Sequence, residues 1–317
     1  MFKLLCVYAI SLAIMLCTMP FFISYLKKIR FNQTVSEYSL DAYKAKKSTP
    51  TMGGVLFVLI PILVSFILNP HMNASLALIL LTFAGYGLIG FLDDYIIVIQ
   101  RDNQGLKPNA KLGLQVALAV LFFYVFYDSL DTTITIPLFK TQLDLGWLYA
   151  PLVYFMFAGA SNAVNITDVM DGLATGCSII AFIPFLIFAW LQGNMQVCIF
   201  LVSLLGALTG FLYYNHFPAK IFMGDAGSLA LGAALAAVSI VLKKELLLII
   251  IGGVFVWETV CVMAQLTSVK LTGKRIFKYT PIHYDFLLSG LKEVTVVRSF
   301  WIIGAVCAVV GLIIGLL

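Results

Sequence analysis

QVCIFLVSLLGALTGFLYY, residues 196–214, is an apolar run without a single charged side chain. AGSLALGAALAAVSIVL, residues 226–242, follows after a short polar loop and also lacks charge. A helix needs about 20 mostly apolar residues to cross the hydrocarbon core of a bilayer. The two runs therefore predict two membrane-spanning helices joined at one membrane face.

The same pattern continues along the whole chain. Of its 317 residues, 62% are hydrophobic and only 11% are charged, whereas soluble domains carry about 25% charged residues. This composition excludes an ordinary water-soluble domain and a disordered chain. Ten apolar runs are present, at 4–26, 53–68, 74–92, 112–127, 147–164, 173–191, 196–214, 226–242, 246–266 and 296–317. We therefore expect an all-α membrane protein with about ten transmembrane helices, forming a single polytopic domain over residues 1–317.

The positive charge predicts how the chain is oriented. If the ten runs span, 16 of the 20 Lys and Arg residues lie in loops on one side. Cytoplasmic loops carry the excess of Lys and Arg, so that side is expected to be cytoplasmic, with both termini outside. The net charge of +5 then reflects topology and anionic lipid rather than nucleic acid. The outer loop 128–146 is expected to form a small hairpin.

Carboxylates carry the chemical information. Five of them fall on the predicted cytoplasmic side, at the ends of apolar runs: Asp93 and Asp94 in GFLDDY, Asp168 and Asp171 in NAVNITDVMDGLATG, and Asp225 in FMGDAGS. The spacing of Asp168 and Asp171 predicts a shared helix face, and Asp225 precedes an apolar run as a helix N-cap does. One such acid alone is more often a structural cap. Five together repel one another unless a cation joins them, and an oxygen-only donor set favours Mg²⁺.

Basic and aromatic side chains accompany these acids. Lys46 and Lys47 precede STPTMGG (48–54), and Lys111 begins the fourth predicted span. Each is more often a positive-inside anchor, but beside a metal-loaded acidic site they can hold a diphosphate. His283 lies in KLTGKRIFKYTPIHYDF (270–286), where structural and functional roles have similar weight. Phe222, three residues before Asp225, is either a packing residue or a platform for a base.

Taken together, the motifs resemble one family, the phospho-N-acetylmuramoyl-pentapeptide transferases of bacteria. The matching segments are STPTMGG (48–54), GFLDDY (90–95), NAVNITDVMDGLATG (162–176), YYNHFPAKIFMGDAGSLALG (213–232) and GKRIFKYTPIH (273–283). The resemblance implies ten helices in the inner membrane, a cytoplasmic active-site cleft and a homodimer. It implies transfer of phospho-MurNAc-pentapeptide from its UDP carrier to undecaprenyl phosphate, giving lipid I and UMP, with Mg²⁺ required.

The resemblance also implies roles for individual residues. Those implied to be catalytic are Asp93, Asp94, Asp225 and His283. Those implied to hold the metal are Asp225 and Asn165. Those implied to bind the nucleotide sugar are Lys46, Thr51, Lys111, Asn165, Asp168, Asp171, Asn215, Phe222 and Gln265. One segment departs from the family pattern, which has three consecutive His residues after Pro-x. Here only His283 remains, followed by Tyr284 and Asp285.

Two mechanisms are open for Asp93. It can act as a base that takes a proton from the lipid phosphate, or as a nucleophile that forms a covalent intermediate. A phosphate monoester has a second pKa of about 6, so much of the lipid phosphate is already a dianion at neutral pH. We therefore favour direct attack, with Asp93 and Asp94 orienting the lipid phosphate or the metal.

Other functions remain possible on the sequence alone. A sister enzyme that transfers GlcNAc-1-phosphate to the same lipid would share the carboxylates and the metal, although STPTMGG and the TPIH loop favour the muramoyl-peptide class. An ion-coupled transporter would place its acids near the bilayer midplane, often in repeated halves. A lipid-binding scaffold would not need so many converging acids.

Overall fold

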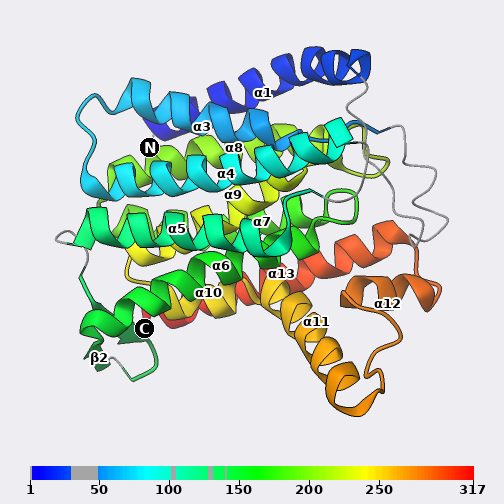
Figure 1. The fold of residues 1–317 in the computed structure, drawn as a ribbon. Helices are drawn as coiled ribbons and strands as arrows, with labels where there is room; N and C mark the ends of the chain where they lie inside the picture. Colours follow the sequence, from blue (N-terminus) through cyan, green and yellow to red (C-terminus); the bar gives the residue numbers. More distant parts are fainter. Residues whose placement is uncertain (1, 30–48, 101–104, 128–130, 140) are drawn as a thin grey trace.

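The computed structural model describes residues 2–29, 49–100, 105–127, 131–139 and 141–317, which form an elongated bundle of helices (Figure 1). The longer helices are α1 Phe2–Lys28, α3 Gly54–Leu68, α4 Ala74–Gln100, α5 Pro108–Phe126, α6 Tyr149–Thr167, α7 Leu173–Leu191, α8 Met195–Asn215, α9 Asp225–Val241, α11 Gly253–Thr272 and α13 Glu293–Leu316. Shorter elements are β1 Thr133–Ile136, β2 Thr141–Asp144, the 3₁₀ helix η3 Gly146–Leu148, α10 Glu245–Ile251 and α12 Ile282–Leu288.

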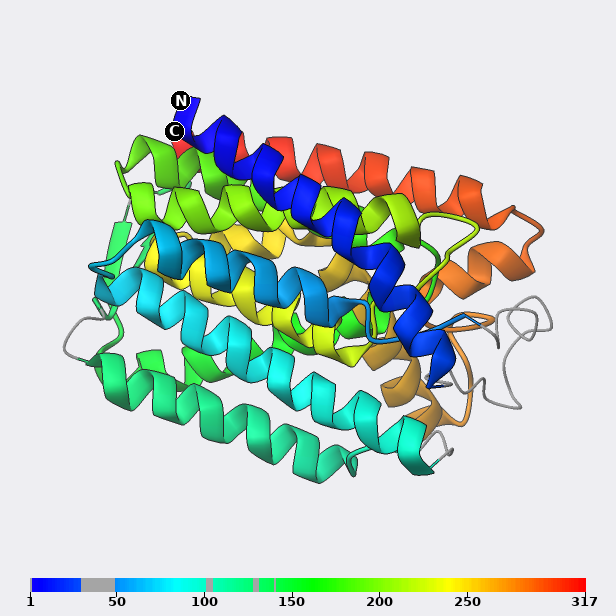
Figure 2. The same cartoon turned by 90° about the horizontal axis from the view of Figure 1, so that it is seen from above.

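Within the described residues, seven helices are long and apolar enough to cross a membrane: α1, α4, α5, α7, α8, α11 and α13. Helices α3 and α9 are apolar but shorter. The prediction of a mostly helical membrane protein is confirmed, whereas the count of ten spans and the orientation stay predictions. The chain begins and ends at the same end of the bundle (Figures 1 and 2), as an even number of crossings requires.

Two predicted boundaries were wrong. The run at 246–266 is not one helix, because it breaks at Gly252 into α10 and α11, and α11 leans away from the bundle (Figure 1). Asp93 and Asp94 do not end their helix, since α4 continues to Gln100. The predicted hairpin in the outer loop is confirmed, because β1 and β2 pair antiparallel with Thr133 opposite Asp144.

Helix α9 lies at the centre of the bundle, where every residue from 226 to 240 is buried. Its sequence is rich in Gly, Ala and Ser, which let helix backbones approach closely within a membrane. A Cβ atom added at Gly90 of α4 would lie only 2.0 Å from the carbonyl oxygen of Asp225. The first turn of α9 therefore packs directly on α4, next to Asp93 and Asp94.

Candidate active site

Asp94 caps the start of α9 from a different helix. Its Oδ1 accepts a hydrogen bond from the backbone amide of Asp225 at 3.0 Å, and its Oδ2 accepts one from the amide of Ala226 at 3.0 Å. These are two of the amides that a helix N-terminus leaves without partners. The prediction that Asp225 is the N-cap was wrong: the cap residue is Gly224, with φ of 75°, and Asp225 is the first helical residue. Because Asp94 satisfies these amides, the Asp225 carboxylate contacts other groups.

The Asp225 carboxylate has partners from two other helices. Its Oδ2 contacts the Nζ of Lys111 from α5, and its Oδ1 accepts a hydrogen bond from Asn165 Nδ2 at 2.7 Å. The same Asn165 amide donates to Ser228 Oγ at 2.9 Å, so its direction is fixed. The Oδ1 of the same side-chain amide is an oxygen of the kind that hard metal ions bind.

Asp93 lies on the other side of the same lysine. The Nζ of Lys111 is 3.7 Å from Asp93 Oδ2, and Asp93 Oδ1 accepts a hydrogen bond from the Leu106 amide at 2.9 Å. The backbone at Gly105 passes so close that an added Cβ would lie 2.7 Å from both Asp93 carboxylate oxygens. Residues 105 and 106 therefore cover this carboxylate and direct its remaining oxygen toward Lys111.

Asp168 joins this group from the end of α6. The backbone N–H of Gly224 donates a hydrogen bond to it, while burial, together with the negative charges of Asp225 and Asp171, raises the pKa of Asp168 to about 8. Thr51 is also near, since a Cβ at Gly224 would lie 3.0 Å from its Oγ1. The STPTMGG and FMGDAGS segments, far apart in the sequence, thus meet at one place.

Backbone pairing holds these two segments together. The amide of Phe222 donates to the carbonyl of Pro50 at 2.8 Å, and the amide of Gly53 donates to the carbonyl of Phe222 at 2.9 Å. The amide of Gly54 donates to the carbonyl of Met223 at 2.9 Å. Phe222 is therefore fixed at the edge of the carboxylate group with a half-buried side chain. Lys46, the remaining predicted residue of this segment, lies outside the described residues.

The carboxylate cluster, which we define as Asp93, Asp94, Asp168 and Asp225, brings together more carboxyl groups than cationic partners. Among the described residues, the one ammonium group paired with it is that of Lys111. No three His, Cys, Asp or Glu side chains in the described ranges are already arranged to enclose a metal ion. The donor set still fits one, because it consists of carboxylate and amide oxygens, which hard divalent cations prefer, and because a cation, Lys111, already lies between Asp225 and Asp93.

Asp171 does not join the cluster. Asp168 and Asp171 share no helix face, because α6 ends at Thr167 and the chain turns through Gly172, with φ of 77°, before α7 begins. The Asp171 side chain accepts a hydrogen bond from the Ala219 amide at 2.9 Å, and its own amide donates to Glu293 at 3.0 Å. The predicted shared helix face was therefore wrong, since local turn geometry turns the two side chains to different partners.

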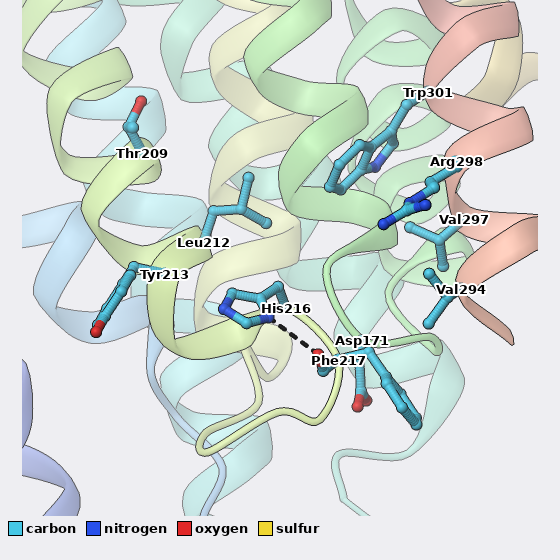
Figure 3. A pocket seen from close by; sticks show the side chains of 10 residues that line it. All are labelled: Asp171, Thr209, Leu212, Tyr213, His216, Phe217, Val294, Val297, Arg298 and Trp301. Carbon is cyan, nitrogen blue, oxygen red and sulfur yellow. Dashed lines mark hydrogen bonds between the residues drawn. The ribbon is translucent and has the colours of Figure 1, made fainter.

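Figure 3 shows the neighbouring pocket to which Asp171 belongs. This cavity of about 410 Å³ lies between the end of α8 and the start of α13, and Trp301, Arg298 and His216 are among its lining residues. His216 Nδ1 lies 3.0 Å from the Phe217 carbonyl oxygen. The cavity is a separate space beside the cluster, and the cluster's four acids do not line it.

Three other predicted site residues hold loops instead of facing the cluster. Asn215 donates to the Ile221 carbonyl at 3.0 Å and accepts from Thr175 at 2.7 Å. Gln265 accepts from the amides of 276 and 277. The His283 ring is fully buried, with Nδ1 3.0 Å from Glu258 Oε1. Direct participation of these three in binding or chemistry stays a prediction.

Sequence reasoning missed the residues that orient the acids. Ser228, Leu106 and Gly90 act through a hydroxyl group, a backbone amide and a missing Cβ. At these positions, none of the three residue types indicates a catalytic or metal-binding role. Ser228 had one usable signal, because it lies three residues after Asp225 on the same predicted helix and therefore shares its face.

The comparisons with known proteins agree with this geometry. The model of glycosyl transferase family 4 matches residues 76–243, which contain all four acids of the cluster. A signature of phospho-N-acetylmuramoyl-pentapeptide transferases matches residues 46–58. Proteins named phospho-N-acetylmuramoyl-pentapeptide-transferase from Bacillus thuringiensis and Bacillus anthracis are 46% and 45% identical to this chain over 316 residues, 98% of each chain.

This chain belongs to the phospho-N-acetylmuramoyl-pentapeptide transferase family. The family resemblance predicted from the sequence motifs is therefore confirmed. In this member of the family, STPTMGG lies within the signature region and contacts the loop before α9. The family segment with the greatest departure, around His283, is also the one that the structure attaches to α11 and not to the cluster.

Proposed function

We propose that the protein transfers phospho-MurNAc-pentapeptide from UDP-MurNAc-pentapeptide to undecaprenyl phosphate, releasing UMP and forming lipid I. The observation that carries this proposal is the gathering of four carboxylates from three separate segments, with Asp93 and Asp225 in contact with Lys111, in a member of this transferase family. Two anionic substrates can meet only where cations offset their repulsion, so a charge-rich site at helix ends suits the reaction.

The reaction breaks one bond and forms another. An oxygen of the lipid phosphate attacks the sugar-bearing phosphorus of the nucleotide, and the bridging bond to UMP breaks with its electron pair leaving on UMP. Asp93 orients the attacking phosphate, while Lys111 offsets the charge of the diphosphate. Asp94 is a positioning residue, because both of its oxygens hold the first turn of α9 and thereby aim Asp225.

A divalent cation, Mg²⁺ by the chemistry of the donors, would be held by Asp225 and the Asn165 carbonyl oxygen and would supply charge neutralisation and alignment of the diphosphate. Asn165 keeps the Asp225 carboxylate in a single direction through its hydrogen bond at 2.7 Å. Lys111, which contacts Asp225, supplies a second positive charge for the phosphates.

Residues around the cluster receive roles in nucleotide-sugar binding. Those that border the cluster directly are Thr51, Lys111, Asn165, Asp168 and Phe222, with Phe222 as the platform for uracil. Asp171, Asn215 and Gln265 hold the loops that border the substrate. Lys46 contributes a cation to the diphosphate, and His283 belongs to the loop on the sugar side.

The polyprenyl chain needs an apolar path that ends near the cluster. A cavity of about 320 Å³ lies between α6 and α10–α11, and its lining is almost wholly apolar, from Phe155 and Ile249 to Ala163 and Val164. One lining residue, Val164, directly precedes Asn165, which hydrogen-bonds to Asp225 of the cluster. It accommodates the lipid tail while the phosphate stays at the membrane surface.

The protein is placed in the bacterial inner membrane, with the cluster facing the cytoplasm. The support is the seven candidate spans and the bias of Lys and Arg toward the loops on the carboxylate side. A nucleotide sugar then arrives from water and the lipid phosphate from the headgroup plane. The protein acts as a homodimer, which the family resemblance supports.

The direct test follows UMP release from purified protein with undecaprenyl phosphate and each of two nucleotide sugars. UDP-MurNAc-pentapeptide is expected to support turnover, and UDP-GlcNAc is not. Asp93→Asn is expected to lower kcat at least about 100-fold, whereas Asp144→Asn, an exposed acid in β2, serves as the matched control. Turnover with UDP-GlcNAc alone would assign the sister reaction instead.

The direct-attack mechanism has its own test. Protein incubated with labelled nucleotide sugar, but without lipid acceptor, is expected to release no UMP and to retain no label after denaturation. Stoichiometric label retained by wild type and lost in Asp93→Asn would instead establish a covalent intermediate on that carboxylate.

A further inference from the structure

A single face of α11 holds the loop that follows it. Glu258 and Gln265 are seven residues apart, which is close to two helical turns, so they lie on the same side of α11. Gln265 accepts hydrogen bonds from the amides of Ile276 and Phe277 at 2.9 and 3.0 Å and donates to the Phe277 carbonyl at 3.1 Å. One amide side chain thus fixes the middle of the loop at residues 273–281.

Glu258 fixes the end of the same loop. Its Oε2 accepts a hydrogen bond from the Ile282 amide at 2.9 Å, and its Oε1 lies 3.0 Å from His283 Nδ1. Both Glu258 and His283 are fully buried, with 0% of each side chain exposed. Among the described residues, His283 is the one side chain that hydrogen-bonds this glutamate. A buried acid in a membrane helix is costly and is retained where it has a defined task.

The geometry selects one tautomer of the histidine. A carboxylate accepts hydrogen bonds, so the Glu258 oxygen requires a proton on Nδ1. His283 Nε2 is enclosed and has no hydrogen-bond partner among the described residues. Without the carboxylate nothing in these contacts would hold the ring in this orientation. A carboxylate that orients an imidazole in this way is a recurrent device for fixing the tautomer.

The loop held by these contacts is basic. Lys274, Arg275 and Lys278 are exposed on it. Lys278 lies between the two points at which α11 holds the loop, and Lys274 and Arg275 directly precede the first of them. We propose that Glu258 is a positioning residue for the transfer reaction, which fixes the tautomer of His283 and the register of the basic loop toward the nucleotide sugar. This inference rests on the proposed function and extends it to a residue outside the recognised motifs.

A spectroscopic experiment tests the tautomer without relying on activity. The chain has three His residues, so protein labelled with ¹⁵N-histidine gives three pairs of ring signals, assigned with His71→Gln, His216→Gln and His283→Gln. Wild-type His283 is expected to carry its proton on Nδ1. In Glu258→Gln the side-chain amide competes as a donor, so the proton is expected on Nε2. An unchanged His283 tautomer in Glu258→Gln would overturn the proposal.

Kinetics test the positioning role. Glu258→Gln is expected to raise KM for UDP-MurNAc-pentapeptide about tenfold or more, with KM for undecaprenyl phosphate changed less than twofold. His283→Asn keeps a donor at the place of Nδ1, so its KM for UDP-MurNAc-pentapeptide is expected to stay at least threefold below that of His283→Val, which is expected to match Glu258→Gln. His216→Gln, an exposed histidine, is the control.

The outcomes separate this inference from the proposed function. Failure of wild type to release UMP would contradict the function, whereas the tautomer result would still stand. Equal KM values for wild type and Glu258→Gln, or a loss confined to kcat, would overturn the positioning role. If Glu258→Gln does not fold, the comparison of His283→Asn with His283→Val decides the question in the same way.

Discussion

Two clusters of buried charge lie at opposite ends of the bundle, and they differ in balance. At the hairpin end, the Glu245 carboxylate is 4% exposed, accepts a hydrogen bond from the Tyr149 hydroxyl at 2.6 Å, and lies 3.1 Å from Lys243 Nζ. One acid there meets one cation and one hydroxyl donor. At the other end, the four acids of the carboxylate cluster have one ammonium partner among the described residues, that of Lys111, which contacts Asp93 and Asp225.

This difference in charge balance distinguishes a structural site from a functional one. A balanced buried pair fixes the structure and leaves nothing for a ligand to satisfy. An unbalanced group of like charges costs stability and is maintained where a substrate or cation completes it. The hairpin-end pair therefore fits a structural role, and the carboxylate cluster fits the active site that we propose.

The largest effect is expected from a substitution within the carboxylate cluster. Asp225→Ala removes the acid that Lys111 and Asn165 both contact, so UMP release is expected to fall at least about 100-fold, without full rescue by added Mg²⁺. The melting temperature is expected to stay within about 2–4 °C of wild type, because one of several repelling charges is lost. Full activity in this variant would contradict the assignment.

The next effect concerns the packing beneath the cluster. Gly90→Ala adds a methyl group that clashes with the first turn of α9, because a Cβ at this position would lie 2.0 Å from the carbonyl oxygen of Asp225. We expect a loss of at least about 1–3 kcal/mol in unfolding free energy, together with lost activity. Gly113→Ala on α5 is the matched control, since nothing lies within 4 Å of its Cβ, and it should be neutral or stabilising. Equal stability of the two variants, measured by thermal unfolding, would refute the close approach.

A smaller effect is expected at the balanced pair. Tyr149→Phe removes the hydroxyl donor to buried Glu245, which should cost about 1–3 kcal/mol of unfolding free energy. The folded variant should release UMP at the wild-type rate, because the pair lies at the far end of the bundle. A tenfold loss of kcat in well-folded Tyr149→Phe would show that the two ends are coupled.

The smallest effect involves the exposed hairpin. Hydrogen bonds from the amide and hydroxyl of Thr133 lower the pKa of Asp131. A lowered folded-state pKa stabilises the protein above the unfolded value near 4, and this contribution disappears as the pH falls through the folded value. The melting temperature of Asp131→Asn should therefore lie slightly below wild type at pH 7 and converge with it as the pH falls through the lowered pKa of Asp131. A gap that widens as the pH falls would be contrary to this sign.

The sequence predicted the helical membrane architecture because apolar runs of bilayer length have few alternative structures. It also predicted that Asp93, Asp94 and Asp225 belong together, since these acids stand out against an apolar background. It could not show that Asp94 caps α9, because a cap supplied from 131 residues away leaves no local pattern. The predicted helix face of Asp168 and Asp171 failed because α6 ends at Thr167, so that both acids lie in the turn before α7.

The burial of His283 was equally invisible to sequence reasoning. Its partner Glu258 lies in the middle of an apolar segment, 25 residues earlier. The sequence pattern points to acids at the ends of the apolar runs, and it gives no role to an acid in the middle of one. The spacing of Glu258 and Gln265 was the available signal, and only the loop contacts in the structure give it meaning.

The central claim is that the carboxylate cluster forms the place for a divalent cation beside the substrates. Binding of Mn²⁺ to purified protein, followed by electron paramagnetic resonance, tests it without relying on turnover. We predict one bound Mn²⁺ per chain in wild type and in Asp144→Asn, with affinity reduced at least tenfold in Asp225→Ala. Undiminished Mn²⁺ binding in Asp225→Ala would contradict the account.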